Sequence, residues 1–135
     1  MTEEKTYVIM ALGSNTNCRR NIKDAADCLS QYLSGMVVSS VIQSAAVDNG
    51  YGVYANMLVA GSTALSYPNL RSACKLIEQS FGDMPGSHAT GIVNIDIDIL
   101  QHGDTRHHLR DWNRSYICTL MEELKSKNIK IQDYE

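Results

Sequence analysis

Two hydrophobic periodicities alternate along this chain, and their order restricts the folds it can adopt. Four segments rich in apolar and β-branched side chains are predicted to be strands, namely residues 5–12, 36–44, 54–63 and 92–100. Three segments carry apolar side chains at helical spacing and are predicted to be helices, namely residues 19–33, 68–81 and 113–126. The resulting order is β-α-β-β-α-β-α.

That order is typical of the split βαβ arrangement. We therefore expect an α+β, ferredoxin-like sandwich in which an antiparallel-rich sheet carries its helices on one face. No internal repeat or linker divides the chain, so residues 1–135 are expected to form a single domain. Residues 83–91 are predicted to be a flexible connection, and the last residues, which alternate weakly, a short strand or a frayed end.

Capping residues mark the predicted helix boundaries. Asn17 is a candidate cap for the first helix, which Gly35 would end. Ser66 followed by Pro68 is typical of a helix start, and Gly82 of a helix end.

The composition excludes several classes of function. The 135 residues are 44% hydrophobic, which suits one domain with a core of ordinary size. The formal net charge is −3 and no basic tract occurs, so a nucleic acid held through its phosphates is not an expected partner. No run approaches the roughly 20 apolar residues of a membrane helix. The N-terminus lacks a secretion signal and the four cysteines form no CxxC pair, so we expect a cytoplasmic protein with reduced thiols.

The last predicted strand places two carboxylates on one face. Residues two apart on a strand point the same way, so Asp96 and Asp98 share a face opposite the neighbouring isoleucines. Their bases would lie about 7 Å apart, which lets both lean toward one cation. Mg²⁺ favours one or two carboxylates together with substrate phosphates. The pair predicts a magnesium site for a phosphorylated ligand, although a strand with one wet face shows the same alternation.

Five segments together resemble a known family, and they occur in its order: ALGSN (11–15), VVSSVIQS (37–44), VYANMLVAG (53–61), IEQSFG (77–82) and NIDIDIL (94–100). They resemble the 6-hydroxymethyl-7,8-dihydropterin pyrophosphokinase of folate biosynthesis, over about residues 5–124. The resemblance implies a ferredoxin-like fold and Mg-ATP-dependent pyrophosphoryl transfer to the pterin. The implied cofactors are two Mg²⁺ ions with ATP as co-substrate, and the implied partners are the small molecules pterin and ATP, with no membrane and an open oligomeric state.

The resemblance also implies roles for individual residues. The implied metal ligands are Asp96 and Asp98, which form the catalytic set together with Arg114. The implied pterin-binding residues are Ser44, Val47, Tyr54, Asn56 and Tyr116. The implied nucleotide-binding residues are Glu78, Ile99 and His108. A flat pterin suits two aromatic faces, and the Asn amide offers its edge a donor and an acceptor.

The chain departs from the family pattern on the nucleotide side. No Lys or Arg occurs between Leu76 and Thr105, where the family carries several arginines. Gln43 replaces a further arginine, and Arg106 is one candidate to compensate. Positioned cations stabilise transferring phosphoryl groups. A second hypothesis is therefore a catalytically impaired homologue that binds a pterin-like ligand without ATP chemistry.

The histidines suggest a third hypothesis. His102, His107 and His108, together with the carboxylates, could bind a transition metal. However, adjacent histidines on an extended segment point apart, and the spacing HxxxxHH is not that of a standard site. Solvated loop histidines explain the same pattern.

Overall fold

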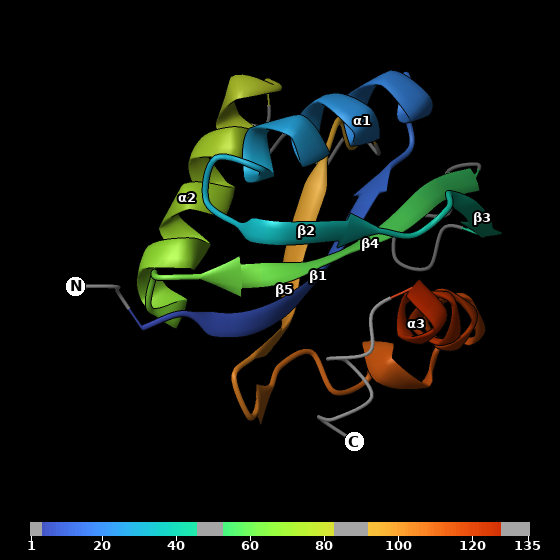
Figure 1. Cartoon of the computed structure of the whole chain (residues 1–135). Helices are drawn as coiled ribbons and strands as arrows, with labels where there is room; N and C mark the ends of the chain where they lie inside the picture. The colour runs from blue at the N-terminus through green and yellow to red at the C-terminus, as the bar shows by residue number, and fades with distance from the viewer. Residues whose placement is uncertain (1–3, 46–52, 83–91, 128–135) are drawn as a thin grey trace.

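An antiparallel sheet forms the centre of the computed structural model (Figure 1), which describes residues 4–45, 53–82 and 92–127. The strands are β1 (Thr6–Ser14), β2 (Ser34–Val38), β3 (Ile42–Ala45), β4 (Val53–Thr63), β5 (Asp96–His102) and β6 (Thr105–Arg106). The helices are α1 (Cys18–Leu29), α2 (Tyr67–Ser80) and α3 (Ser115–Lys127), with a 3₁₀ turn, η2 (Asp111–Asn113), before the last.

The strand order confirms the predicted α+β sandwich. Within the described residues, the sheet has six strands in the order β2-β4-β1-β5-β6, and β3 pairs with β4 beyond the end of β2. β1 lies between β4 and β5 and is antiparallel to both. The short β6, which the sequence did not predict, pairs with the end of β5.

The helices cover both faces of the sheet, so the prediction that they share one face was wrong (Figure 1). Val8, Met10 and Leu12 of β1 pack with the buried side chains of α1 and α2. Tyr7 and Ile9, which alternate with them, pack with those of α3. A strand buried on both faces reads as a continuous apolar run rather than an alternating one. The apolar run of β1 therefore already indicated two covered faces.

The helix ends agree only partly with the predicted caps. The Ser66 hydroxyl accepts a hydrogen bond from the Asn69 backbone N–H at 3.3 Å, which confirms it as the cap of α2. Asn17 occupies the cap position of α1, but its backbone is left-handed (φ 42°) and its side chain makes no capping hydrogen bond. α1 ends at Leu29, several residues before the predicted end. The buried Leu33, which prolonged the helical pattern, lies beyond the helix.

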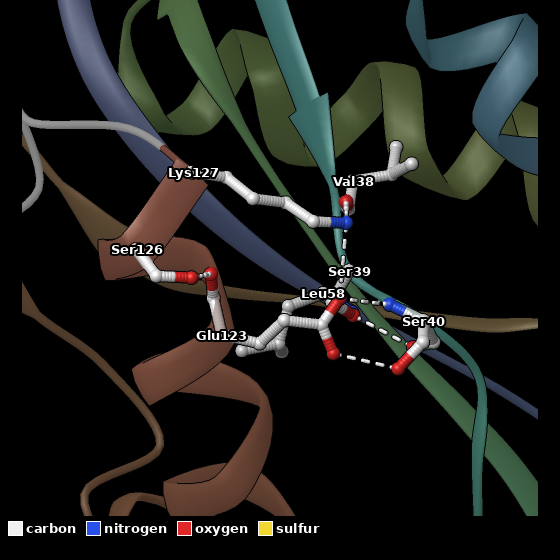
Figure 2. Close-up of polar contacts among 7 residues, drawn as sticks. All are labelled: Val38, Ser39, Ser40, Leu58, Glu123, Ser126 and Lys127. Atoms are coloured by element: carbon white, nitrogen blue, oxygen red, sulfur yellow. Dashed lines mark hydrogen bonds and ion pairs between the residues drawn. The ribbon is translucent and has the colours of Figure 1, made fainter.

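The predicted second strand is split where α3 contacts it (Figure 2). Ser39 donates its backbone N–H to the Leu58 carbonyl at 2.9 Å, and its hydroxyl accepts the Leu58 N–H at 2.8 Å. The backbone N–H and the hydroxyl of Ser40 each donate to the Glu123 carboxylate of α3 at 2.6 Å. Lys127 donates to the Val38 carbonyl at 3.1 Å. Side chains thus replace ladder hydrogen bonds at the break and fix α3 to the sheet.

The predicted last strand begins later than expected. Val93 exchanges hydrogen bonds with Asn15, accepting its backbone N–H at 3.0 Å and donating to its side-chain oxygen at 2.7 Å. Asn94 donates its amide to the Phe81 carbonyl at 2.8 Å. These contacts replace strand pairing before Asp96 and tie the start of β5 to the ends of β1 and α2.

Two expectations from the composition can be compared with the structure. None of the helices in the described ranges is long and apolar enough to cross a bilayer. All four cysteines are free thiols, and Cys74 is a buried core residue whose pKa burial raises to about 12.

Candidate functional site

A row of paired residues crosses one end of the sheet on the face that α3 partly covers. Asp96 of β5 pairs with Gly13 of β1, and Gly13 pairs in turn with Asn56 of β4. Asn56 then pairs with Ile42 of β3. Residues directly opposite one another in an antiparallel pair project to the same face. The carboxylate of Asp96 and the amide of Asn56 therefore face the same side, separated by a glycine without a side chain.

Tyr54 belongs to this face as well. It lies two residues before Asn56 on β4 and pairs with Ser44 of β3. Its Cδ2 atom would lie 3.7 Å from a Cβ at Gly13, so the ring extends from β4 toward β1. A larger residue at Gly13 would occupy the space between this ring and the Asn56 amide.

The Asn56 side chain is held by its own strand neighbours. The Asn56 Nδ2 group donates to the Ser44 hydroxyl at 2.8 Å and to the Ile42 carbonyl at 3.2 Å. The side chain is buried, and its Oδ1 lies on the Gly13 side, 3.6 Å from where a Cβ would be. These contacts orient the amide, so the acceptor oxygen is the atom directed toward the middle of the row.

A cleft lies between β3 and the start of α3. Its volume is about 410 Å³, and its lining residues are Ile42, Gln43, Ser44, Arg114, Ser115, Tyr116 and Thr119. Small-molecule sites in proteins occupy roughly 300–1,000 Å³. The structure therefore brings the predicted residues Ser44, Tyr116 and Arg114 to one cleft, beside Asn56 and Tyr54.

A second cluster surrounds Asp98. His108 Nε2 lies 3.7 Å from Asp98 Oδ1, and Asp111 of η2 provides a third potential ligand in the same cluster. Arg114 donates its Nε–H to Asp111 Oδ1 at 2.8 Å. Burial, the Asp111 carboxylate and the Glu78 carboxylate, in that order, raise the pKa of Asp98 from 3.8 to about 6.

A divalent cation fits the donors on this face. Asp96 and Asp98 point to the same side of β5, as the sequence predicted, and both are half-buried. Burial and the carboxylates of Asp111 and Glu78 disfavour the charged form of Asp98, and a bound cation would offset that repulsion. Asp96 and Asp98 therefore stay the predicted ligands of a magnesium ion, and their position on one face of β5 is compatible with that prediction.

Other predicted residues lie elsewhere. The buried carboxylate of Glu78 accepts the Ile97 backbone N–H at 2.8 Å and lies 3.3 Å from Lys75 Nζ, so it supports the outer edge of β5. The Ile99 side chain is in the core beneath α1 and α2, on the opposite face. Only its backbone could contact a nucleotide bound at the carboxylates. Val47 lies outside the described residues.

The three histidines do not lie together, because His107 and His102 contact Tyr67 and Leu65 whereas His108 lies beside Asp98. His107 stacks on Tyr67 with ring centres 4.0 Å apart, and burial lowers its pKa. His102 Nε2 lies 2.9 Å from the Leu65 carbonyl oxygen. Within the described residues, only His108 joins carboxylates in a group able to hold a metal. The predicted metal site of three histidines is therefore not assembled.

Sequence reasoning missed Asp111. Its spacing of three residues before Arg114 is a signal for an ion pair on a helical turn. Nothing in the local pattern indicates its approach to Asp98, which depends on how the chain turns after β5. Arg106, the candidate compensating cation, lies over the Trp112 ring at 4.1 Å from its centre.

Residues 9–126 match the family of 7,8-dihydro-6-hydroxymethylpterin-pyrophosphokinase (HPPK). A similar solved structure is that of Plasmodium falciparum HPPK-DHPS with pteroate, at 15% identity and a TM-score of 0.52. The likeness covers 76% of this chain but 28% of that one, and at this identity it shows the fold alone. No curated protein sequence matches the chain.

Proposed function

Because the chain belongs to the 7,8-dihydro-6-hydroxymethylpterin-pyrophosphokinase family, we propose that it transfers a pyrophosphoryl group from Mg-ATP to 6-hydroxymethyl-7,8-dihydropterin, a step of folate biosynthesis. The observation that supports this most strongly is the row Asp96–Gly13–Asn56 across three adjacent strands. A carboxylate that would bind metal and an amide that would recognise the pterin edge therefore lie on one face.

The pterin would bind at the β3–β4 end of the row. Tyr116 lines the cleft and Tyr54 extends from β4 toward β1, so the ring would lie between two aromatic faces. Asn56 would accept a hydrogen bond from the pterin edge through Oδ1, because Ser44 and Ile42 already accept from its Nδ2. The backbones of Ser44 and Val47 would complete the pocket.

The triphosphate would lie toward β5. Two Mg²⁺ ions, when bound, would neutralise part of its charge and align it for displacement. Asp96 and Asp98 would hold these ions, and Arg114, at the edge of the cleft, would be directed toward the phosphates. His108, beside Asp98, and the backbone of Ile99 are the nearest described groups for the nucleotide. Glu78 would act indirectly, by fixing the edge of β5.

The reaction would need positioning more than covalent chemistry. The pterin hydroxymethyl oxygen attacks the β-phosphorus of ATP, the bond from that phosphorus to the α-phosphate bridging oxygen breaks, and AMP leaves. The hydroxyl proton passes to solvent or to a neighbouring carboxylate. The row sets the Asn56 amide and the Asp96 carboxylate two strands apart, roughly 10 Å at the backbone. A ring held at Asn56 would therefore direct its hydroxymethyl oxygen across Gly13 toward the phosphates at β5.

A second candidate is a homologue that binds a pterin-like ligand without ATP chemistry. Residues 76–105 contain no Lys or Arg, and Arg114 is already hydrogen-bonded to Asp111. Both observations favour this second candidate. Each positioned cation that is lost commonly reduces the rate of such a reaction by about a hundredfold. The pterin half of the site does not depend on these cations.

The deciding experiment measures AMP formed from ATP, Mg²⁺ and hydroxymethyl-dihydropterin. The wild-type chain should form AMP only with all three present, and chelation of Mg²⁺ should stop it. Asp96→Ala should abolish the reaction, whereas Asp104→Ala, on the exposed turn between β5 and β6, should leave it unchanged. Wild-type activity no higher than that of Asp96→Ala would exclude the enzyme. Calorimetric binding of the pterin without binding of Mg-ATP would then support the second candidate.

A further inference from the structure

We propose that Asp98, His108 and Asp111 form a binding site for one divalent transition-metal ion, and that this site is filled without nucleotide. One ligand atom from each of the three side chains lies within 4.8 Å of the others. A bound ion with ligand bonds of about 2.0–2.2 Å requires these atoms to approach to roughly 3 Å, which side-chain rotation can supply. The proposal does not depend on the pterin chemistry.

The backbone already brings the three ligands together. Asp98 is held in β5 by pairing with Ala11 of β1. After β6, the His107 backbone N–H donates to the Leu100 carbonyl at 2.9 Å, which returns the chain to β5. The Asp111 N–H then donates to the His108 carbonyl at 2.8 Å and sets the spacing of those two side chains. The ligands therefore come from two segments, β5 and residues 107–111, that hydrogen bonds hold in place.

The backbone of His108 is also unusual. Its φ of 54° lies in the left-handed region, which few residues other than glycine adopt. This conformation accompanies the placement of the imidazole beside Asp98.

Arg114 orients the Asp111 carboxylate through a hydrogen bond. The Arg114 Nε–H binds Asp111 Oδ1 at 2.8 Å, so Oδ2 can serve a cation. Partners of this kind, which orient a ligating carboxylate, are a regular feature of protein metal sites. The side chains of Asp98, His108 and Asp111 are 33%, 41% and 27% exposed, so an ion can reach them from solvent.

The donor set selects a class of ion. One imidazole nitrogen with two carboxylates suits Mn²⁺, Co²⁺, Ni²⁺ or Zn²⁺, whereas Mg²⁺ prefers oxygen donors and keeps several waters. The Asp96–Asp98 pair offers only two carboxylates and would depend on substrate phosphates to complete its coordination. Three protein ligands remove that dependence, so the metal should bind the isolated chain.

The test uses the full chain, free of nucleotide, with Mn²⁺ followed by electron paramagnetic resonance and Co²⁺ by visible absorption. We expect one Mn²⁺ per chain and an imidazole nitrogen coupling. His108→Ala should remove that coupling, and both His108→Ala and Asp111→Asn should weaken binding by roughly 10- to 100-fold. Asp104→Asn, on the exposed turn, should bind as the wild type does. Mg²⁺ at equal concentration should not displace Mn²⁺.

The two sites share Asp98, so one further variant distinguishes them through Asp96, which belongs only to the carboxylate pair of β5. Asp96→Ala should retain nucleotide-free Mn²⁺ binding while losing AMP formation. Loss of Mn²⁺ binding in Asp96→Ala, or unchanged binding in both His108→Ala and Asp111→Asn, would overturn the proposal. Metal-free thermal unfolding of each variant shows whether it is folded. Since the readout needs neither ATP nor pterin, its failure would leave the proposed function untouched.

Discussion

The two faces of the sheet use the same strands for different purposes. Beneath α1 and α2, the middle of β1 and of β5 contributes apolar side chains to the core, namely Val8, Met10, Leu12, Ile97 and Ile99. Beneath α3, the apolar contacts of Tyr7, Ile9 and Leu100 give way, toward Gly13 and Asp96, to the polar row. Among the described residues, α3 covers only part of its face, and the proposed ligand would occupy the remainder.

This difference separates stability from function within single strands. In β5, Ile97 and Ile99 point to the closed core, while Asp96 and Asp98, one residue away, point to the site. Substitutions on alternate residues of one strand should therefore have distinct effects.

Truncation on the closed face should reduce stability and leave the site intact. Leu29 of α1 is fully buried, and Leu29→Ala should lower the free energy of unfolding by about 2–5 kcal/mol, because it removes apolar contacts and leaves a cavity. Urea unfolding measures the loss. Below the unfolding transition, pterin affinity per folded chain should equal that of the wild type. A large loss of affinity in the folded protein would show that the two faces are coupled.

Removal of the Asp98 charge, on the face of the polar row, should reduce activity without reducing stability. Asp98→Asn should reduce AMP formation by about a hundredfold or more, because a metal ligand is lost.

The folded-state pKa of Asp98 in the wild type, about 6, lies above the ordinary 3.8, so the folded chain holds more protons than the unfolded chain between these values. Wild-type stability should consequently fall as pH rises through this window.

This pH dependence is measured by thermal unfolding of the wild type and of Asp98→Asn, with chelator, at several pH values. Asp98→Asn should unfold at a higher temperature than the wild type above pH 6, and the difference should shrink toward pH 4. A variant less stable than the wild type at pH 7 would contradict the electrostatic account of this carboxylate.

Weakening the contact of Glu123, which fixes α3 to the sheet, should lower the free energy of unfolding only slightly. Glu123→Gln weakens the hydrogen bonds from Ser40 and the ion pair with Lys127, both partly exposed, and should cost about 1 kcal/mol (Figure 2). Those Ser40 bonds lower the pKa of Glu123, so its contribution is present above the ordinary pKa and disappears as pH falls below it. Urea unfolding at pH 7 and pH 3 should show a difference only at pH 7.

The sequence predicted the strand and helix order because local periodicity encodes it. It also predicted which residues share a face of β5, since that follows from strand geometry alone. The break between β2 and β3 could not be predicted, because it depends on Glu123, 83 residues from Ser40. The approach of Asp111 to Asp98 likewise depends on a chain reversal that leaves no periodic signal. The sequence did not predict which face α3 covers, although the continuous apolar run of β1 is typical of a strand buried on both faces.

Nuclear magnetic resonance of the ¹⁵N-labelled chain can show whether a flat ligand binds beside α3, on the face of the polar row. On titration with hydroxymethyl-dihydropterin, the amide signals of Gly13, Asn56 and Tyr116 should shift most, and those of Ala25, Leu29 and Ala73 beneath α1 and α2 should stay in place. Dominant shifts around the apolar groove between α1 and β2, which Met36 and Val38 line, with Gly13 and Asn56 unchanged, would contradict the account.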